Sequence, residues 1–350
     1  MKTLTLVAYS QLEMMEVPEP VAVAGEVVLR VAACGICGSD VHGYDGTSGR
    51  RIPPIIMGHE GAGVVESVGE GVTGFAPGDR VTFDSTVYCG VCEYCERGEV
   101  NLCDHREVVG VSCGEYRRMG AFAEQIAVPA RILYRLPDTL SFAEAAMLEA
   151  VSVALHAVRL SEPKSGETAL VIGAGMIGLL TAQAARALGY TRVLVADVDA
   201  SRLTMAQELG VEETICLTGD ALVERVLKLT ESRGVDAAFE AVGASVTVNA
   251  AIESARKGGR VVLIGNIQAK VDLPLQKVVT RQLRLQGSAA SAGEYPLAME
   301  LMTAGKIRVK PLISAVAHLD EGAMWFDRLH KKEAGLLKVV LTPRPDEVWN

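Results

Sequence analysis

The sequence predicts a chain of two domains, one built mainly of β-strands and one in which parallel strands alternate with helices. Three observations support this prediction. The first 145 residues contain short β-branched runs separated by Gly or Pro, which are typical of strands and tight corners. From Glu167 onward, strand and helix patterns alternate, as in a parallel sheet covered by helices on both faces. Finally, 49% of the 350 residues are apolar, which is enough for two hydrophobic cores.

In the first domain, strands are predicted at four short runs, which read GEVVLRVAACGIC, HEGAGVVESVGEGV, GDRVTF and AFAEQIAVPARILYRL. The pattern then changes to a helical period from Ser141 to Arg159, and Ser141 with Glu144 forms a capping box at its start. The segment after residue 288 mixes helix and strand patterns without a second nucleotide-binding rhythm. We therefore expect residues 1–150 and 288–350 to form one domain around an inserted domain of residues 151–287.

The charge pattern argues against nucleic acid and membranes as partners. The formal net charge is −9, and no block of five or six like charges occurs. No apolar stretch approaches the about 20 residues that a membrane-spanning helix needs. The first residues lack the apolar core and cleavage site of a signal peptide. Eight cysteines, mostly clustered at metal-binding spacing and without such a signal, predict reduced thiols and a cytoplasmic protein.

Four cysteines follow one another at C-x2-C-x2-C-x7-C spacing in the run YCGVCEYCERGEVNLC. Four thiolates are the ligands of a closed, tetrahedral zinc site. Gly90 and Gly98 allow the loop to turn back so that all the sulfurs point inward. Because a closed site leaves no position for a substrate, we expect residues 89–103 to form a structural zinc lobe. Its ligands would be Cys89, Cys92, Cys95 and Cys103.

The run TALVIGAGMIG predicts a dinucleotide site where a strand turns into a helix. Gly173 permits the turn, Gly175 lets the backbone approach a pyrophosphate, and Gly178 lets helix and strand pack closely. Asp197 ends the next strand, where a carboxylate accepts the ribose hydroxyls of NAD and repels the 2′-phosphate of NADP. NAD is therefore the predicted cofactor. Arg202 is either a cofactor contact, to adenine or to a phosphate, or a surface cation of the following helix.

Cys37, His59 and Glu60 suit a second zinc ion, with one coordination position left open for catalysis. Each of the three is ambiguous when taken singly. A cysteine in a glycine-rich loop commonly fills apolar space, and a G-H-E triplet is often only a turn. Their occurrence together, ahead of a dinucleotide-binding motif, favours a metal-dependent enzyme.

Taken together, these motifs resemble those of the zinc-dependent medium-chain alcohol and polyol dehydrogenases, in the sorbitol dehydrogenase-like branch. The resemblance covers essentially the whole chain and includes the runs GEVVLRVAACGICGSDVH, PPIIMGHEGAGVVESVGEGV, MLEAVSVALHA, VIGAGMIGLL and VADVDASRL. It implies a GroES-like β-barrel catalytic domain with an inserted Rossmann domain, two zinc ions per chain, and a homo-oligomer, either a dimer or a homotetramer. Further cofactor contacts are expected at Met176, Ile177, Val242, Gly243, Ile264, Gly265 and Ala289.

The resemblance also implies the ligands of the catalytic zinc. Cys37 and His59 would bind the ion, and Glu60 would approach it when water or substrate leaves. The third ligand is a later cysteine in the alcohol dehydrogenase branch and a glutamate in the polyol branch. The corresponding stretch of this chain has no cysteine, whereas Glu149 lies in MLEAVSVALHA, where the polyol branch reads LEP. We therefore predict that Glu149 binds the zinc directly or through water; the alternative is a carboxylate that only favours a helix N-terminus.

The implied reaction is the zinc-dependent, NAD-linked oxidation of a secondary alcohol to a ketone, with the proton leaving through Ser39 and His42. Two departures limit the substrate prediction. Gly43 stands where sorbitol dehydrogenases have a tyrosine, and Ala290 and Ser291 stand where they have Arg-Tyr. Another polyol, a sugar alcohol or its phosphate, threonine and a simple alcohol all remain as candidates. The competing functions, a zinc-free quinone reductase and an NAD-bound redox sensor, do not require the predicted catalytic ligands.

Overall fold

The computed structural model describes residues 1–113 and 116–350, except for the side chain of Cys113, and it divides into two compact units. Unit 1 comprises Met1–Glu149, Tyr295–Thr303 and Val309–Asn350, and unit 2 comprises Ala150–Glu294 and Ala304–Arg308. Among the described residues, no helix has both the length and the apolar character needed to cross a membrane.

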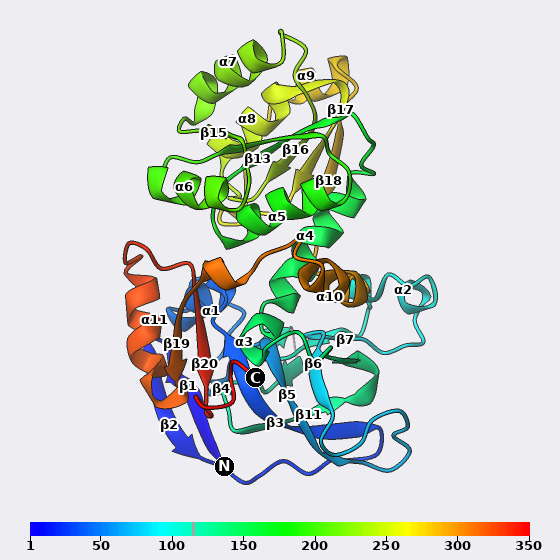
Figure 1. Ribbon diagram of the computed structural model, residues 1–350, viewed down its shortest axis with the longest axis vertical. Helices are drawn as coiled ribbons and strands as arrows, with labels where there is room; N and C mark the ends of the chain where they lie inside the picture. Colours follow the sequence, from blue (N-terminus) through cyan, green and yellow to red (C-terminus); the bar gives the residue numbers. More distant parts are fainter. Residues whose placement is uncertain (114–115) are drawn as a thin grey trace. The chain divides into compact units, whose positions relative to one another are not determined.

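The strands and helices are numbered along the chain as in Figure 1. The strands of unit 1 are β1 (Lys2–Ala8), β2 (Gln11–Glu16), β3 (Glu26–Gly35), β4 (Ile55–Ile56), β5 (Glu60–Val68), β6 (Arg80–Phe83), β7 (Thr86–Val87), β8 (Glu107–Val108), β9 (Val111–Cys113), β10 (Tyr116–Arg118), β11 (Gln125–Pro129), β12 (Leu133–Arg135), β19 (Ile313–His318) and β20 (Lys338–Thr342). Those of unit 2 are β13 (Thr168–Ile172), β14 (Arg192–Ala196), β15 (Glu213–Ile215), β16 (Val235–Glu240), β17 (Ala255–Leu263) and β18 (Arg284–Gly287).

The α-helices are α1 (Gly38–Tyr44), α2 (Glu93–Glu96), α3 (Phe142–Ala145), α4 (Leu148–Leu160), α5 (Met176–Ala187), α6 (Ala200–Glu208), α7 (Gly219–Leu229), α8 (Ser245–Ser254), α9 (Leu275–Thr280), α10 (Tyr295–Thr303) and α11 (Gly322–His330). The short 3-10 helices are η1 (Val100–Leu102), η2 (Ala130–Ile132), η3 (Lys310–Leu312) and η4 (Leu319–Glu321).

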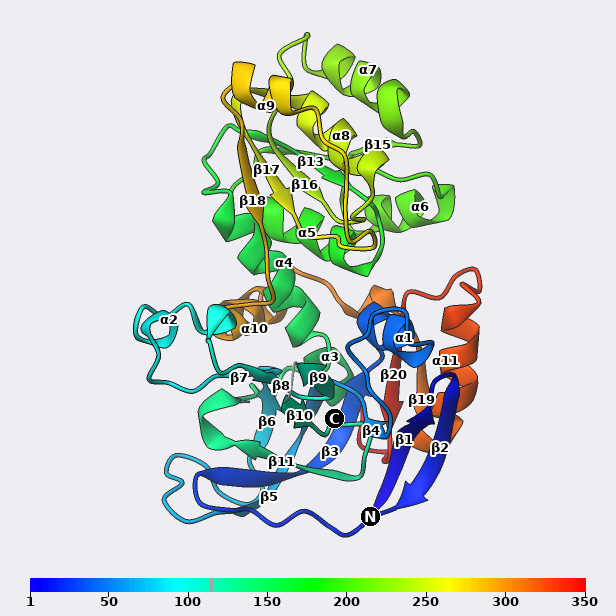
Figure 2. The ribbon, with the colours of Figure 1, turned by 180° about the vertical axis from the view of Figure 1, so that it is seen from behind.

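Unit 1 is built around a seven-stranded sheet in which β3 is central, as the buried, β-branched run GEVVLRVAACG predicts. The strand order is β12-β6-β5-β3-β20-β19, and β11 also pairs with β3. The register places Gly35 opposite Glu60 on β5, and Cys34 opposite Leu341 on β20. Figure 2 shows β20, which comes late in the chain, in the same sheet as β3. The end of β3 therefore brings the segment that follows it, including Cys37, next to the start of β5.

The helical period predicted from Ser141 to Arg159 forms two helices instead of one, α3 and α4. The predicted capping box at the start is present: the Ser141 hydroxyl accepts from the backbone N–H of Glu144, and the Glu144 carboxylate accepts from the N–H of Ser141. The α3 helix ends at Ala145, so the capping box starts a helix of only four residues. The periodicity persists across the break because both helices bury apolar side chains.

Unit 2 is a sheet of six parallel strands in the order β15-β14-β13-β16-β17-β18. Figure 1 shows α5 and α6 on one face of this sheet and α7, α8 and α9 on the other. This order, with the first strand in the middle, is that of a Rossmann domain. The register aligns the carboxyl ends of five strands, because Ile172 pairs with both Ala196 and Glu240, Glu240 pairs with Leu263, and Leu263 pairs with Gly287. The segments that follow these strands therefore lie along one edge of the sheet.

Candidate metal centres and dinucleotide site

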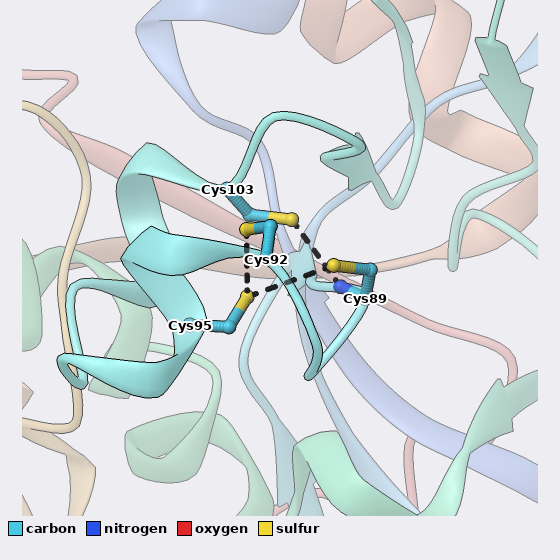
Figure 3. Close-up of side chains that lie close together, drawn as sticks. All are labelled: Cys89, Cys92, Cys95 and Cys103. Atoms are coloured by element: carbon cyan, nitrogen blue, oxygen red, sulfur yellow. Dashed lines mark hydrogen bonds between the residues drawn. The ribbon is translucent and has the colours of Figure 1, made fainter.

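The four predicted lobe cysteines come together in one cluster, and Figure 3 shows their sulfurs directed toward one another. Their sulfur atoms all lie within 4.8 Å of one another. The Cys89 and Cys95 sulfurs are 3.9 Å apart, and those of Cys92 and Cys95 are 3.5 Å apart. Gly90 and Gly98 both have positive φ, +82° and +79°, as a chain that reverses twice within this segment requires. Four sulfurs at this spacing fit a tetrahedral zinc ion.

Backbone N–H groups favour thiolates in this lobe. The N–H groups of Cys95 and Asp104 point toward Cys92 and lower the pKa of its thiol to about 6. The N–H of Val91 donates to the Cys89 sulfur at 3.5 Å and lowers the pKa of that thiol too. Thiolates are the form that binds a metal, so Cys89 and Cys92 are favoured as the first ligands, whereas burial raises the pKa of the Cys95 thiol to about 12.

A second cluster contains Cys37, His59 and Glu60, with one donor atom of each lying within 4.8 Å of the others. Cys37 caps the N-terminus of α1, while His59 and Glu60 lie at the start of β5. Gly58 precedes them with φ +93°, and a Cβ there would lie within 2.9 Å of Phe122 and Cys34 side-chain atoms. The glycine of the G-H-E triplet is thus required for this close turn, which directs His59 toward Cys37.

Asp40 supports the histidine from behind. Its Oδ1 lies 3.3 Å from His59 Nδ1, and its Oδ2 accepts the backbone N–H of Cys37 at 3.2 Å. Burial acts to raise the pKa of Asp40, but His59 and Arg51 overcome it and hold this pKa far below the usual range. A carboxylate beside Nδ1 favours the tautomer with a proton on that nitrogen, which would leave Nε2 as the metal donor. The donor set and its support therefore fit a zinc ion.

Glu60 forms a buried ion pair with Lys338 of β20, whose Nζ is 2.8 Å from Oε1 and 2.5 Å from Oε2. Burial acts to lower the pKa of Lys338, and the Glu60 and Cys37 charges outweigh it, so the pKa is raised. Lys338 also donates to the Ile36 carbonyl at 3.1 Å. Lys338 thus contacts both the segment before Cys37 and the start of β5, which together provide Cys37, His59 and Glu60.

Glu149 lies at the start of α4 and is not a member of the group whose donor atoms lie within 4.8 Å of one another. Burial raises the pKa of its carboxyl to about 7; His59 acts against this rise and Glu60 adds to it. The charges of His59 and Glu60 therefore affect the Glu149 carboxyl, but Glu149 is not among the residues whose donor atoms lie within 4.8 Å of one another.

Ser39 and His42, the predicted proton route, are both exposed on α1. Both come after Cys37 in the chain. They are three residues apart, so they lie on the same side of this short helix. The Ser39 hydroxyl accepts a hydrogen bond from Arg51 Nη2 at 3.1 Å.

The glycine-rich turn of unit 2 has the shape that a pyrophosphate requires. Gly173 has φ +98°, and a Cβ on Gly178 would overlap the Gly173 carbonyl oxygen, so neither position accepts a side chain. A Cβ on Gly175 would meet nothing within 4 Å, which leaves open space above the turn. Gly175 is the N-cap of α5 and provides no side-chain cap, so the first N–H groups of the helix, at Met176 and Ile177, can bind an anion.

Asp197 follows β14, and its carboxylate contacts the glycine turn. Oδ2 accepts the N–H of Ala174 at 2.6 Å, and Oδ1 accepts the N–H of Asp199 at 2.9 Å. Arg202 is 45% exposed in its side chain and has Nη1 3.9 Å from Asp197 Oδ2. The acidic side chain thus lies where β14 ends, beside the glycine-rich turn.

The remaining predicted cofactor positions follow β16, β17 and β18 at the same edge. Gly243 has φ +85°, and a Cβ there would overlap the backbone of Gly265 and Asn266. Glu240 is fully buried and accepts the N–H groups of Val242, at 2.9 Å, and Gly243, at 2.8 Å. Ile264 follows β17, and Ala289 is exposed after β18.

No sequence motif singles out Asp40, Arg51, Lys338 or Glu240. Asp40 had a possible signal, because it follows Cys37 by three residues at the start of a helix. Lys338 contacts Glu60 across 278 residues of sequence, and no spacing rule predicts such a pair.

Comparison with known proteins assigns the family. Residues 23–138 match the alcohol dehydrogenase GroES-like domain, and residues 177–304 match the zinc-binding dehydrogenase family. L-Idonate 5-dehydrogenase of Vitis vinifera is 36% identical, with 83% of this chain and 80% of the relative covered. Sorbitol dehydrogenase of Bacillus subtilis is 31% identical, with 95% and 94% covered.

A solved structure of a zinc-binding dehydrogenase from Sinorhizobium meliloti, bound to NADP, resembles this chain with a TM-score of 0.88. It is 32% identical, and the match covers 98% of this chain and 99% of the other. The predicted fold, a GroES-like β domain with an inserted Rossmann domain, is therefore confirmed. The chain belongs to the zinc-dependent medium-chain alcohol and polyol dehydrogenases.

Proposed function

We propose that the protein oxidises a secondary alcohol of a polyol, or of a related sugar alcohol, to a ketone, with NAD as the hydride acceptor and zinc at the Cys37 cluster. The observation that supports this most directly is the convergence of Cys37, His59 and Glu60 within 4.8 Å. Thiolate, imidazole and carboxylate donors together suit a zinc ion. A zinc-free quinone reductase or an NAD-bound redox sensor would not need this cluster.

Zinc, NAD and the residues of the chain have separate proposed roles. When bound, zinc would lower the pKa of the substrate hydroxyl, and NAD would accept the hydride from the carbon that bears it. Cys37 and His59 are the proposed protein ligands, with Glu149 as the third, directly or through water. Ser39 and His42 on α1 are proposed to carry the hydroxyl proton toward solvent. The lobe of residues 89–103 is proposed to hold a second zinc ion that stabilises the fold.

NAD is the proposed cofactor because Asp197 lies at the end of β14. A carboxylate there accepts ribose hydroxyls and repels a 2′-phosphate. The Sinorhizobium relative is bound to NADP, so this fold also accepts the phosphorylated cofactor in another protein. Arg202 beside Asp197 is the residue of this chain that would attract such a phosphate.

The substrate class is proposed from two considerations. The relatives named for idonate and sorbitol act on polyhydroxylated compounds, which favours a polyol here. Gly43, Ala290 and Ser291 replace the larger side chains of sorbitol dehydrogenases, which disfavours sorbitol itself.

Two measurements test this function. Metal analysis is expected to give two zinc ions per chain; none would indicate a quinone reductase, and one without turnover would indicate a sensor. Initial rates with NAD over polyols, sugar alcohol phosphates, threonine and simple alcohols are expected to be highest with a polyol or its phosphate. A preference for threonine or for a simple alcohol would overturn the substrate class while leaving the dehydrogenase assignment intact.

A further inference from the structure

We propose that Arg51 is a positioning residue of the catalytic site: its guanidinium fixes the Asp40 carboxylate behind His59 and orients the Ser39 hydroxyl. Arg51 lies in the loop between α1 and β4, outside every motif discussed above. This inference rests on the proposed function, because it concerns the same cluster and the same proton route.

The contacts form a continuous chain, in which the links from Arg51 to Asp40 and Ser39 are hydrogen bonds and the link from Asp40 to His59 is an ion-pair contact. Arg51 is 3% exposed in its side chain, and Asp40 is fully buried. Nε and Nη2 of Arg51 donate to Asp40 Oδ1 at 3.2 and 2.8 Å. The same Nη2 donates to Ser39 Oγ at 3.1 Å. Asp40 in turn reaches His59 Nδ1, at 3.3 Å, and the N–H of Cys37, at 3.2 Å.

Each contact has a defined chemical consequence. A buried carboxylate needs charged or hydrogen-bonding partners, and the planar fork of an arginine holds it in one orientation. Because a guanidinium has donors and no acceptor, the Ser39 oxygen must be the acceptor toward Arg51. The Ser39 hydrogen is then left to point away from Arg51. This is the orientation in which an exposed hydroxyl can donate to a neighbouring oxygen on a proton route.

Gly43 provides the space for this arginine. A Cβ on Gly43 would overlap the Cγ of Arg51 and lie 2.8 Å from its Cβ. Gly43 lies within α1, where alanine is intrinsically more favourable than glycine. The absence of a side chain at position 43 is therefore explained by the aliphatic part of Arg51. Gly43 thus serves to admit Arg51, in addition to any effect on substrate size.

The packing is tested by the variants Gly43→Ala, Arg51→Ala and their combination, using the thermal unfolding midpoint of the zinc-loaded protein. Gly43→Ala is expected to lower the midpoint in the wild-type background, because it displaces Arg51. In the Arg51→Ala background it is expected to raise the midpoint or leave it unchanged, because the helix gains an alanine without a clash. Equal losses in both backgrounds would overturn the role given to Gly43.

The positioning role is tested by zinc affinity, measured in competition with a fluorescent chelator, with the four-cysteine lobe as the internal reference. Arg51→Ala is expected to weaken the catalytic zinc about 10-fold and to leave the lobe unchanged, as for other groups that support a ligand. Arg51→Lys keeps the charge but not the planar fork, and its affinity for the catalytic zinc is expected to lie between those of the wild type and Arg51→Ala. This variant keeps the test possible if Arg51→Ala does not fold. Arg50→Ala removes an adjacent, exposed arginine and is the matched control. Arg51 variants with the affinity of Arg50→Ala would overturn the proposal.

The link to Ser39 is tested by a double-mutant cycle on kcat/KM. If Arg51 acts through Ser39, Arg51→Lys costs several-fold in the wild type and clearly less in the Ser39→Ala background. Equal costs in both backgrounds would remove Ser39 from the proposal. A wild-type protein that oxidises no alcohol would contradict the proposed function, whereas the zinc and unfolding measurements would still decide the role of Arg51.

Discussion

Lys338 is the buried counter-ion of Glu60, with Nζ within 2.8 Å of both carboxylate oxygens. The two side chains are 3% and 1% exposed. Since Glu60 also belongs to the Cys37 cluster, a metal ion held by Cys37 and His59 would compete with Lys338 for this carboxylate. The ion pair with Lys338 therefore explains how the Glu60 carboxylate can lie beside a metal site without binding the metal.

Lys338→Met is expected to lower the free energy of unfolding by about 3 kcal/mol, because it leaves a carboxylate buried without its partner. Urea unfolding of the protein without zinc at the Cys37 cluster measures this, because an ion there would itself compensate the Glu60 charge. Lys331→Met removes an exposed lysine and serves as the control. Adding Glu60→Gln to Lys338→Met is expected to recover most of the loss; if it recovers none, the buried charge is not the cause.

Cys92→Ser is expected to remove one zinc ion per chain and to destabilise unit 1, while Cys37 and His59 keep their metal. A closed site contributes binding free energy directly to folding. Metal analysis together with thermal unfolding checks both parts, and Cys216→Ser, at an exposed cysteine outside both clusters, is the control. Two zinc ions retained in Cys92→Ser would disprove the lobe assignment.

Asp197→Ala is expected to shift cofactor preference from NAD toward NADP, because it removes a negative charge from the place where a 2′-phosphate would lie. The ratio of kcat/KM for the two cofactors measures the shift. Asp197 also accepts the Ala174 N–H, so some loss with both cofactors is expected. Asp220→Ala changes an exposed acid in the first turn of α7, away from Asp197 and Arg202 in the sequence, and is the control. An unchanged ratio would assign the preference to Arg202 or to other residues.

Glu149→Ala is expected to reduce turnover by more than about 100-fold and to weaken only the catalytic zinc. Supporting carboxylates alone can cost about 10- to 100-fold, so activity does not decide the role. Zinc absorption spectroscopy with and without NAD does. If the Glu149 oxygens stay beyond direct and one-water reach in every state while Glu60 coordinates, Glu60 is the third ligand.

Asp236 is expected to control part of the acid stability of unit 2. Burial acts to raise the pKa of this carboxyl, but hydrogen bonds from Arg233 and Arg256 outweigh it and lower the pKa to about 2. A carboxyl with a lowered pKa stabilises the fold above its unfolded value near 4, and this contribution disappears as the pH falls to about 2. A shift of this size corresponds to about 2 kcal/mol.

Asp236→Asn should therefore be less stable than the wild type at pH 6, and the difference should shrink as the pH falls from about 4 to 2. Unfolding free energies at several pH values measure this convergence. Asp220→Asn, at an acid in the first turn of α7, is the comparison variant. A difference that stays constant with pH would mean that Asp236 acts through packing and not through its charge.

Local motifs were predictable from the sequence, because their residues lie close together along the chain. The structure brings the four lobe cysteines together, gives Gly173 a positive φ and forms the capping box at Ser141, while zinc and dinucleotide binding stay predictions. The break between α3 and α4 was not predicted, since the same apolar period continues through both. The pair of Glu60 and Lys338 could not be predicted either, because only tertiary structure brings its members together.

The placement of Lys338 on β20 has a consequence for the order of events during synthesis. The Ile36 N–H donates to the Val339 carbonyl at 2.9 Å, so the end of β3 is held by β20, which leaves the ribosome much later than β3 does. Until then, Glu60 has no lysine, and the backbone before Cys37 lacks its partner. The four lobe cysteines lie within 15 consecutive residues, 89–103, and the backbone N–H groups that favour their thiolates come from the same stretch or directly after it. The nascent chain can therefore take up its first zinc ion at the lobe long before the catalytic cluster is assembled.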